Sequence, residues 1–195
     1  MTDRAHHRPA RPGADFFAGL EGGPDPEVLR EAADAAATVL VRGARDSTDP
    51  ALPRRLQQLA ETEGLETLAE LWAGAPADSL AGCLWRLFAL RAWVYADSGG
   101  ATDQFDAGRR RSQVATVVAG VPEPPHPDEL RAMVDEVLRG IAERDFADVL
   151  LRASAFARIV AVGRAERGDP DPGRMLSVAE QLEHAAHLEL AGELA

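Results

Sequence analysis

The chain has 195 residues, of which 46% are hydrophobic and 27% charged, and its formal net charge is -11. A chain of this size and composition is typical of one globular domain that needs no disulfides. Its acidic balance disfavours nucleic acid and anionic membranes as partners. Because the chain contains no lysine, a Schiff base and a P-loop lysine are both excluded.

Three further features predict a cytoplasmic protein. No apolar run is long enough to span a bilayer. No apolar core follows the first charged residues, so no signal peptide is expected. The single cysteine, Cys83, cannot form an intramolecular disulfide and is interpreted as a small buried hydrophobic residue.

Residues 1–24 are predicted to form a disordered arm, because arginine, histidine, proline and glycine dominate them. One short apolar segment interrupts this composition and contains Phe16, Phe17 and Leu20. Two interpretations stay open for it. The segment could dock as a linear motif in a groove of a partner protein, or it could fold back over its own core.

A single helical domain is predicted for residues 25–195. Its first helix runs from the Asp25-Pro26 cap to about Arg42, and its second from about Pro53 to Trp72. The apolar stripe of the first helix comprises Val28, Ala32, Ala36, Val39 and Gly43.

The third helix, residues 79–96, is apolar on nearly every side, which is typical of a helix inside a bundle. A loop at Asp97–Gly100 should end it. Further helices are predicted over 102–119, around 130–141, from Asp145 to about 167, and from Arg174 or Ser177 onward, where Ser177 and Glu180 suggest a capping box. The fold class is therefore all-α: a compact bundle of six to eight helices around a central buried helix at about 79–96.

Arg91 is the first candidate site residue, because it lies on an apolar stripe of the central helix. A buried guanidinium needs acceptors. One interpretation is an anion hook in a pocket flanked by Trp85 and Trp93. The favoured alternative is a structural salt bridge to an acid such as Asp106, Asp145 or Asp148.

Metal binding is not expected, and no cofactor is predicted. From Asp169 the sequence partly resembles an EF-hand loop, with Asp171 and Glu180 in ligand positions, but an arginine stands where that loop requires glycine. His184 and His187 are too few for a histidine site and should point away from the core, in pairs with Glu180 and Glu183. The carboxylates and histidines named here remain weak metal candidates.

Arg109, Arg110 and Arg111 precede a segment that faintly resembles the first half of a helix-turn-helix. Four prolines follow where a recognition helix is required, so DNA reading is disfavoured. The run is better interpreted as a surface for an acidic partner, or as an internal match to the chain's own acids.

Three segments together carry a resemblance to a family. They are Leu80–Val94, with its Leu-Trp-Arg-Leu-Phe-Ala-Leu-Arg-Ala-Trp-Val core, Val117–Leu138 and Asp145–Arg164. They resemble uncharacterised, small, all-helical proteins of high-GC actinobacteria, over a little more than half of the chain. The resemblance implies a compact helical domain and brings no activity or functional residue.

The sequence favours a non-enzymatic helical interaction or regulatory module that binds another protein, through the arm, the arginine run or a self-association face that would give a homodimer. One alternative is a small-molecule binder or enzyme with a pocket near Arg91. A transcription regulator is the last alternative.

Overall fold

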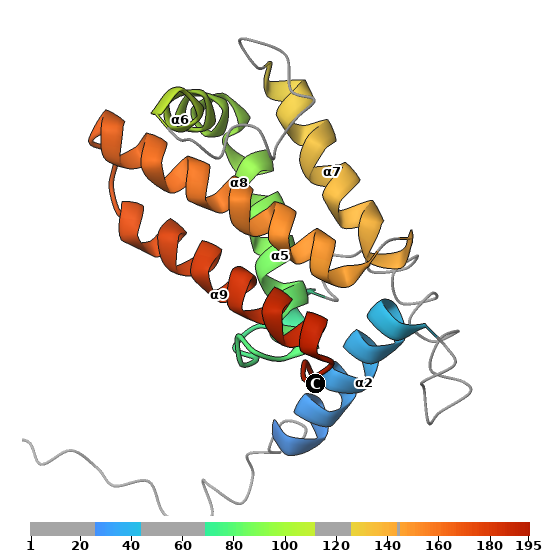
Figure 1. The fold of residues 1–195 in the computed structure, drawn as a ribbon. Helices are drawn as coiled ribbons and strands as arrows, with labels where there is room; N and C mark the ends of the chain where they lie inside the picture. Colours follow the sequence, from blue (N-terminus) through green and yellow to red (C-terminus); the bar gives the residue numbers. More distant parts are fainter. Residues whose placement is uncertain (1–25, 44–68, 112–125, 144) are drawn as a thin grey trace, which may run out of the picture.

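The computed structural model describes residues 26–43, 69–111, 126–143 and 145–195. All regular structure in these ranges is helical, as the sequence predicts, and none of their residues forms a strand. Figure 1 shows the packed bundle. Its labelled helices are α2 (Pro26–Arg42), α5 (Leu80–Ala96), α6 (Ser98–Arg111), α7 (Pro127–Glu143), α8 (Phe146–Arg167) and α9 (Pro172–Ala191).

Side-chain caps set the start of two helices where the sequence places them. The Ser79 hydroxyl accepts a hydrogen bond from the Gly82 backbone N–H at the start of α5. The Asp145 carboxylate accepts one from the Ala147 N–H at the start of α8. Each cap satisfies an N–H group that has no partner within its helix.

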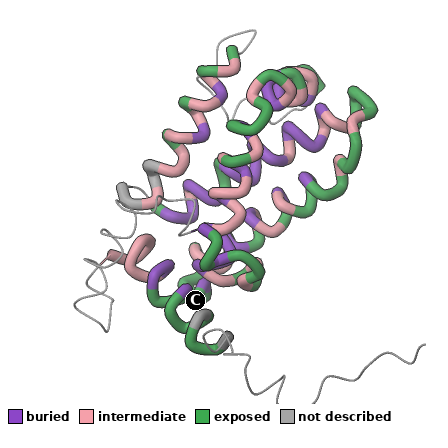
Figure 2. Tube along the Cα trace, turned by 180° about the vertical axis from the view of Figure 1, so that it is seen from behind, coloured by how far each residue is buried: buried purple, intermediate pink, exposed green. Residues whose placement is uncertain are grey.

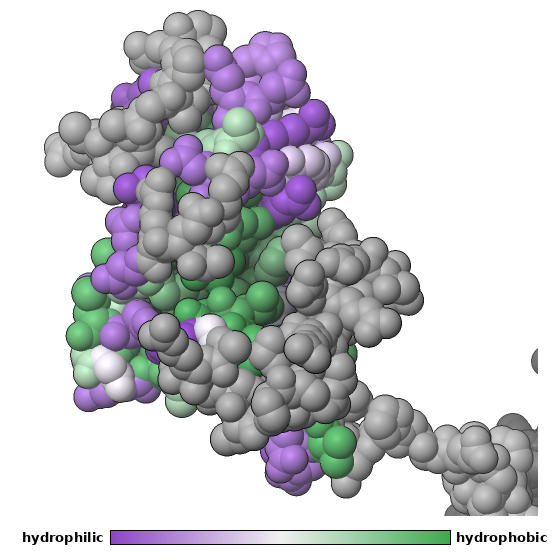
Figure 3. Space-filling model, turned by 90° about the vertical axis from the view of Figure 1, so that its right-hand side faces the viewer, coloured by the Kyte–Doolittle hydropathy of each residue, from purple (hydrophilic) through white to green (hydrophobic). Residues whose placement is uncertain are grey.

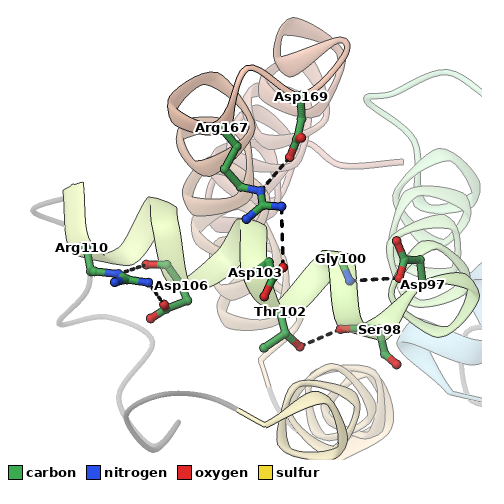
Figure 4. Close-up of polar contacts among 9 residues, drawn as sticks. All are labelled: Asp97, Ser98, Gly100, Thr102, Asp103, Asp106, Arg110, Arg167 and Asp169. Carbon is green, nitrogen blue, oxygen red and sulfur yellow. Dashed lines mark hydrogen bonds and ion pairs between the residues drawn. The ribbon is translucent and has the colours of Figure 1, made fainter.

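The predicted loop between the third and fourth helices is wrong. Asp97 alone separates α5 from α6, and Gly100 belongs to the first turn of α6. The Gly100 N–H donates to Asp97 Oδ1 over 2.9 Å, as Figure 4 shows. A methyl group on Gly100 would lie 2.2 Å from the other oxygen of this carboxylate. Glycine here therefore accommodates a helix cap rather than a loop.

The predicted capping box at Ser177 and Glu180 is also wrong, because both residues lie inside α9. The helix begins earlier, at Pro172, directly after Asp171 in the left-handed region at φ 60°. A proline in the first turn costs no helical hydrogen bond, so the helix can start there.

Helix α5 is central, as predicted, because it contacts α2, α6, α7, α8 and α9. Leu84, Leu87 and Val94 are almost completely buried along it. The sequence does not single out α8 in the same way, yet α8 is packed between α6 and α9 and is buried along most of its length. Figure 2 shows this burial, and it shows α2 as mainly exposed or intermediate.

Helices α6 and α8 cross with their backbones in contact at Gly108 and Gly163. A methyl group on Gly108 would lie 1.8 Å from the Ile159 carbonyl oxygen, and one on Gly163 would lie 1.7 Å from the Gln104 carbonyl oxygen. The backbones of α6 and α8 can approach this closely only if both positions are glycine. The crossing fixes the end of α6 that carries the arginine run.

Helix α2 is held to the bundle by side chains. Ala33, Ala36 and Ala37 are buried on its inner side. The indole N–H of Trp72, itself completely buried, donates to the Ala33 carbonyl oxygen over 3.0 Å. At the C-terminal end of the helix, Arg42 pairs with Glu189 of α9 through its two terminal guanidinium nitrogens.

Apolar side chains also gather on the face that Figure 3 presents. In the bundle, half-buried apolar residues of the C-terminal halves of α2 and α7 pack against the core, among them Val39, Leu40, Val137 and Leu138. None of the described helices is both long and apolar enough to cross a membrane.

Candidate functional site

Arg91 forms a salt bridge with Asp135 of α7, in which Nε lies 2.9 Å from Oδ1. One turn further along α5, the Tyr95 hydroxyl donates to the other oxygen of the same carboxylate over 2.5 Å. The Arg91 guanidinium carbon lies 4.2 Å from the centre of the Tyr95 ring, and that of Arg131 lies 5.4 Å from it. The hydrogen bond to Asp135 raises the pKa of Tyr95 above its ordinary value. These contacts hold α7 against α5.

The acid that pairs with Arg91 is not one of the three that the sequence suggests. Asp106 pairs with Arg109 and Arg110 instead. Asp148 pairs with Arg152 over 2.9 Å, and Asp145 caps α8. Each of these acids has a partner within four residues, so none has to reach Arg91.

Of the two tryptophans predicted beside Arg91, Trp93 contacts other residues. Trp93 packs on α8, with its ring centre 6.4 Å from that of Phe156 and 5.0 Å from the guanidinium carbon of Arg164. Positions 91 and 93 are about 200° apart around a helix, so the two side chains face different neighbours. Trp85 is half-buried against the core. The geometry supports separate structural roles better than one common pocket.

The arginine run lies at the end of α6, where it faces the acids of its own chain. Arg109 and Arg110 both pair with Asp106. Arg111 Nε lies 2.9 Å from Glu166 Oε1 of α8. This geometry favours the internal match over a surface kept for an acidic partner.

Arginines near the C-terminal end of α8 also pair with side chains of α6. The Arg167 guanidinium lies between Asp103 of α6 and Asp169, with nitrogen–oxygen distances of 3.6 Å and 3.1 Å, as Figure 4 shows. Arg164 donates to the Gln104 side-chain oxygen over 2.9 Å. Most of these pairs are exposed and stabilise the protein little individually. They balance charge across the α6–α8 crossing.

The weak metal candidates do not converge. Asp169 pairs with Arg167, and the helical conformation of α9 from Pro172 removes the loop that a calcium site would need. Glu180, His184 and His187 are exposed on α9, in the predicted direction, while Glu183 pairs with Arg158 rather than with His187. No group of three or more histidine, cysteine, aspartate or glutamate side chains within the described ranges could hold a metal ion.

Cys83 is completely buried on α5, as predicted. Burial disfavours the thiolate and raises the pKa of Cys83 to about 12. At neutral pH the side chain is therefore an unreactive thiol.

The remaining predicted partner residues, Phe16, Phe17 and Leu20, lie outside the described residues. Their role as a docking motif stays a prediction.

An exposed apolar seam on α2 is the surface that the sequence misjudges. We name Val28, Ala32, Ala35 and Val39 the α2 seam. Val28 is 57% exposed, both alanines are exposed and Val39 is half-buried. The predicted core stripe of this helix includes Val28 and Ala32, but the buried alanines at positions 33, 36 and 37 lie about 100° further around the helix.

The apolar arc of α2 is thus wider than one contact can bury. Its inner part, at Ala33, Ala36 and Ala37, packs into the bundle. The seam forms its outer part, and the charged residues Glu27 and Glu31 lie beyond it. Because the exposed apolar residues recur on one face of α2, this face is a candidate interaction site.

No family model, curated protein or solved structure matches this chain significantly.

Proposed function

We propose that the protein is a helical interaction or regulatory module that binds another protein through the α2 seam. The observation that carries the proposal is the spacing of the seam together with its exposure. Val28, Ala32, Ala35 and Val39 recur at intervals of four, three and four residues. This is the spacing with which one helix meets another in a two-helix seam.

The contacts of the other candidate surfaces support this choice. Arg91 is held by Asp135, and the arginine run is matched by Asp106 and Glu166. These residues pair with acids of their own chain, whereas Val28, Ala32 and Ala35 of the seam are exposed apolar residues and Val39 alone of the seam packs partly against the core. The partner should therefore present an apolar helix stripe of its own.

A matched pair of substitutions tests the proposal. Ala35→Arg places a long charged side chain in the seam, and Ala132→Arg places one at an exposed position of α7. Each new arginine lies four residues after an acid, Glu31 or Asp128, so both helices gain a similar side-chain pair. Both changes also alter the net charge equally.

The measurement is quantitative capture of partners by the tagged chain in cells that also make an untagged copy. We expect the unsubstituted chain and Ala132→Arg to retain the same partners, and Ala35→Arg to lose at least one of them about 10-fold or more. Equal capture by all three chains would refute the seam as the binding site.

A further inference from the structure

We infer that the partner of the α2 seam is the α2 seam of a second copy of this chain, paired antiparallel. The inference rests on the proposed function and names the occupant of the same surface. Its basis is the order of residue types along the seam and the distribution of charge along α2.

The order of residue types in the seam is the same in both directions. Read either way it is valine, alanine, alanine, valine, at spacings of four, three and four. In an antiparallel pair, Val28 therefore faces Val39 of the other copy, and Ala32 faces Ala35. The alanines let the two backbones approach at the centre, while the valines fill the wider ends. A two-fold axis brings one surface against itself in this way.

The charges of α2 distinguish the antiparallel from the parallel pairing. The N-terminal half of the helix carries Glu27, Arg30, Glu31 and Asp34, which sum to two negative charges, and Arg42 is the charged residue of the C-terminal half. A parallel pair would place acidic half beside acidic half. An antiparallel pair places each acidic half beside the end where Arg42 is already paired with Glu189, so it avoids the contact of acidic half with acidic half, and it also opposes the two helix dipoles.

The flanks of the seam carry little that would oppose this contact. Glu31 and Arg42 are the charged residues of α2 next to the seam. In the antiparallel register Glu31 lies near Thr38 of the other copy rather than near another acid. Among the residues of α2 that flank the seam, self-association therefore places no two acids directly together, although each chain has a net charge of -11.

The interface is small, so the dimer should be weak. Stable protein interfaces bury roughly 1,200–2,000 Å² in total, and one seam of four layers buries less. We expect association that depends on concentration and becomes visible well above the low micromolar range.

Sedimentation of the purified full chain over a range of concentrations tests the inference. We expect the unsubstituted chain and Ala132→Arg to dimerise alike, and Ala35→Arg to dimerise about 100-fold more weakly, because each new arginine would lie against Ala32 of the other copy at the centre of the contact. Matching thermal unfolding of the variants would show that Ala35→Arg remains folded.

The direction of pairing has its own measurement. Cys83 is completely buried, so cysteines introduced at the seam can be cross-linked selectively in the folded protein. A mixture of Val28→Cys and Val39→Cys chains should be joined by a short thiol cross-linker, whereas Val28→Cys alone should not. Efficient cross-linking of Val28→Cys with itself would show a parallel pair and overturn the inference.

The two proposals can fail separately. A purified chain that stays monomeric near millimolar concentration, or a dimer that Ala35→Arg does not weaken, overturns self-pairing. If Ala35→Arg still loses a different protein from the capture experiment, the seam remains a binding site with another occupant. If it loses nothing, both proposals are wrong.

Discussion

Small residues join helices at two places in this molecule, but they meet different kinds of neighbour. At the α6–α8 crossing, Gly108 and Gly163 lie against backbone carbonyl oxygens of the opposite helix. On α2, Ala33, Ala36 and Ala37 lie on the side that packs near Trp72, and the indole of Trp72 adds one hydrogen bond to that helix. A backbone atom cannot move without its helix, whereas a side chain can rotate. The first junction should therefore tolerate no added atom, and the second should tolerate some change.

The surface that we propose for interaction lies on α2 and not on α8. Helix α8 is enclosed by α6 on one side and α9 on another, and Ser154 within it donates to the Ala179 carbonyl oxygen over 2.8 Å. Helix α2 lies at the edge of the bundle in Figure 1, and its apolar arc is covered on one side. The side with exposed apolar residues at Val28, Ala32 and Ala35 belongs to the α2 seam.

The largest effect should come from an added carbon at the glycine crossing. Gly163→Ala should lower the free energy of unfolding by about 4 kcal/mol, above what overpacking typically costs, because the new methyl group meets backbone atoms of α6. Denaturant unfolding measures this. The matched control is Gly173→Ala in α9, where nothing lies within 4 Å, and the change should be neutral or slightly stabilising. Equal stability of the two variants would mean that the crossing is wider than described.

Removing the Trp72 side chain should have the next largest effect. Trp72→Ala should cost about 3 kcal/mol, because a completely buried indole leaves a cavity beside α2. Trp72→Phe keeps most of the apolar contact but loses the hydrogen bond to the Ala33 carbonyl, so it should cost about 1 kcal/mol. Circular dichroism during thermal unfolding measures both. If Trp72→Phe lost as much stability as Trp72→Ala, the contact between this side chain and α2 could not adjust as we expect.

Local sequence patterns predicted the helices well, because caps and periodicity act over a few residues. The apolar positions Leu130 and Val134 are buried on α7 as their spacing requires. The cap residues Ser79 and Asp145 are the N-caps of α5 and α8. The predicted boundary between α5 and α6 was wrong because Asp97 has two roles: it ends α5 and it caps α6.

The contacts between distant residues were not predictable in the same way. Spacing alone could not show that α2 turns Ala33 toward Trp72, because 39 positions separate them. Spacing could not identify the partner of Arg91 either. Asp135, Asp106 and Asp148 each have an arginine four residues later, so local pairing was equally open to all three acids.

The smallest effect concerns the polar contact at the end of α2. Arg42→Gln should cost about 1–2 kcal/mol, because Glu189, whose side chain is 9% exposed, would keep its charge without its arginine partner. Arg30→Gln on the same helix is the control. Its pair with Glu27 is 62% and 70% exposed, so its loss should hardly change stability. Urea unfolding of both variants tests whether α2 is held by this contact as well as by Trp72. If the two variants unfold alike, the apolar contact alone holds α2 in place. The α2 seam should then keep its position with or without Arg42.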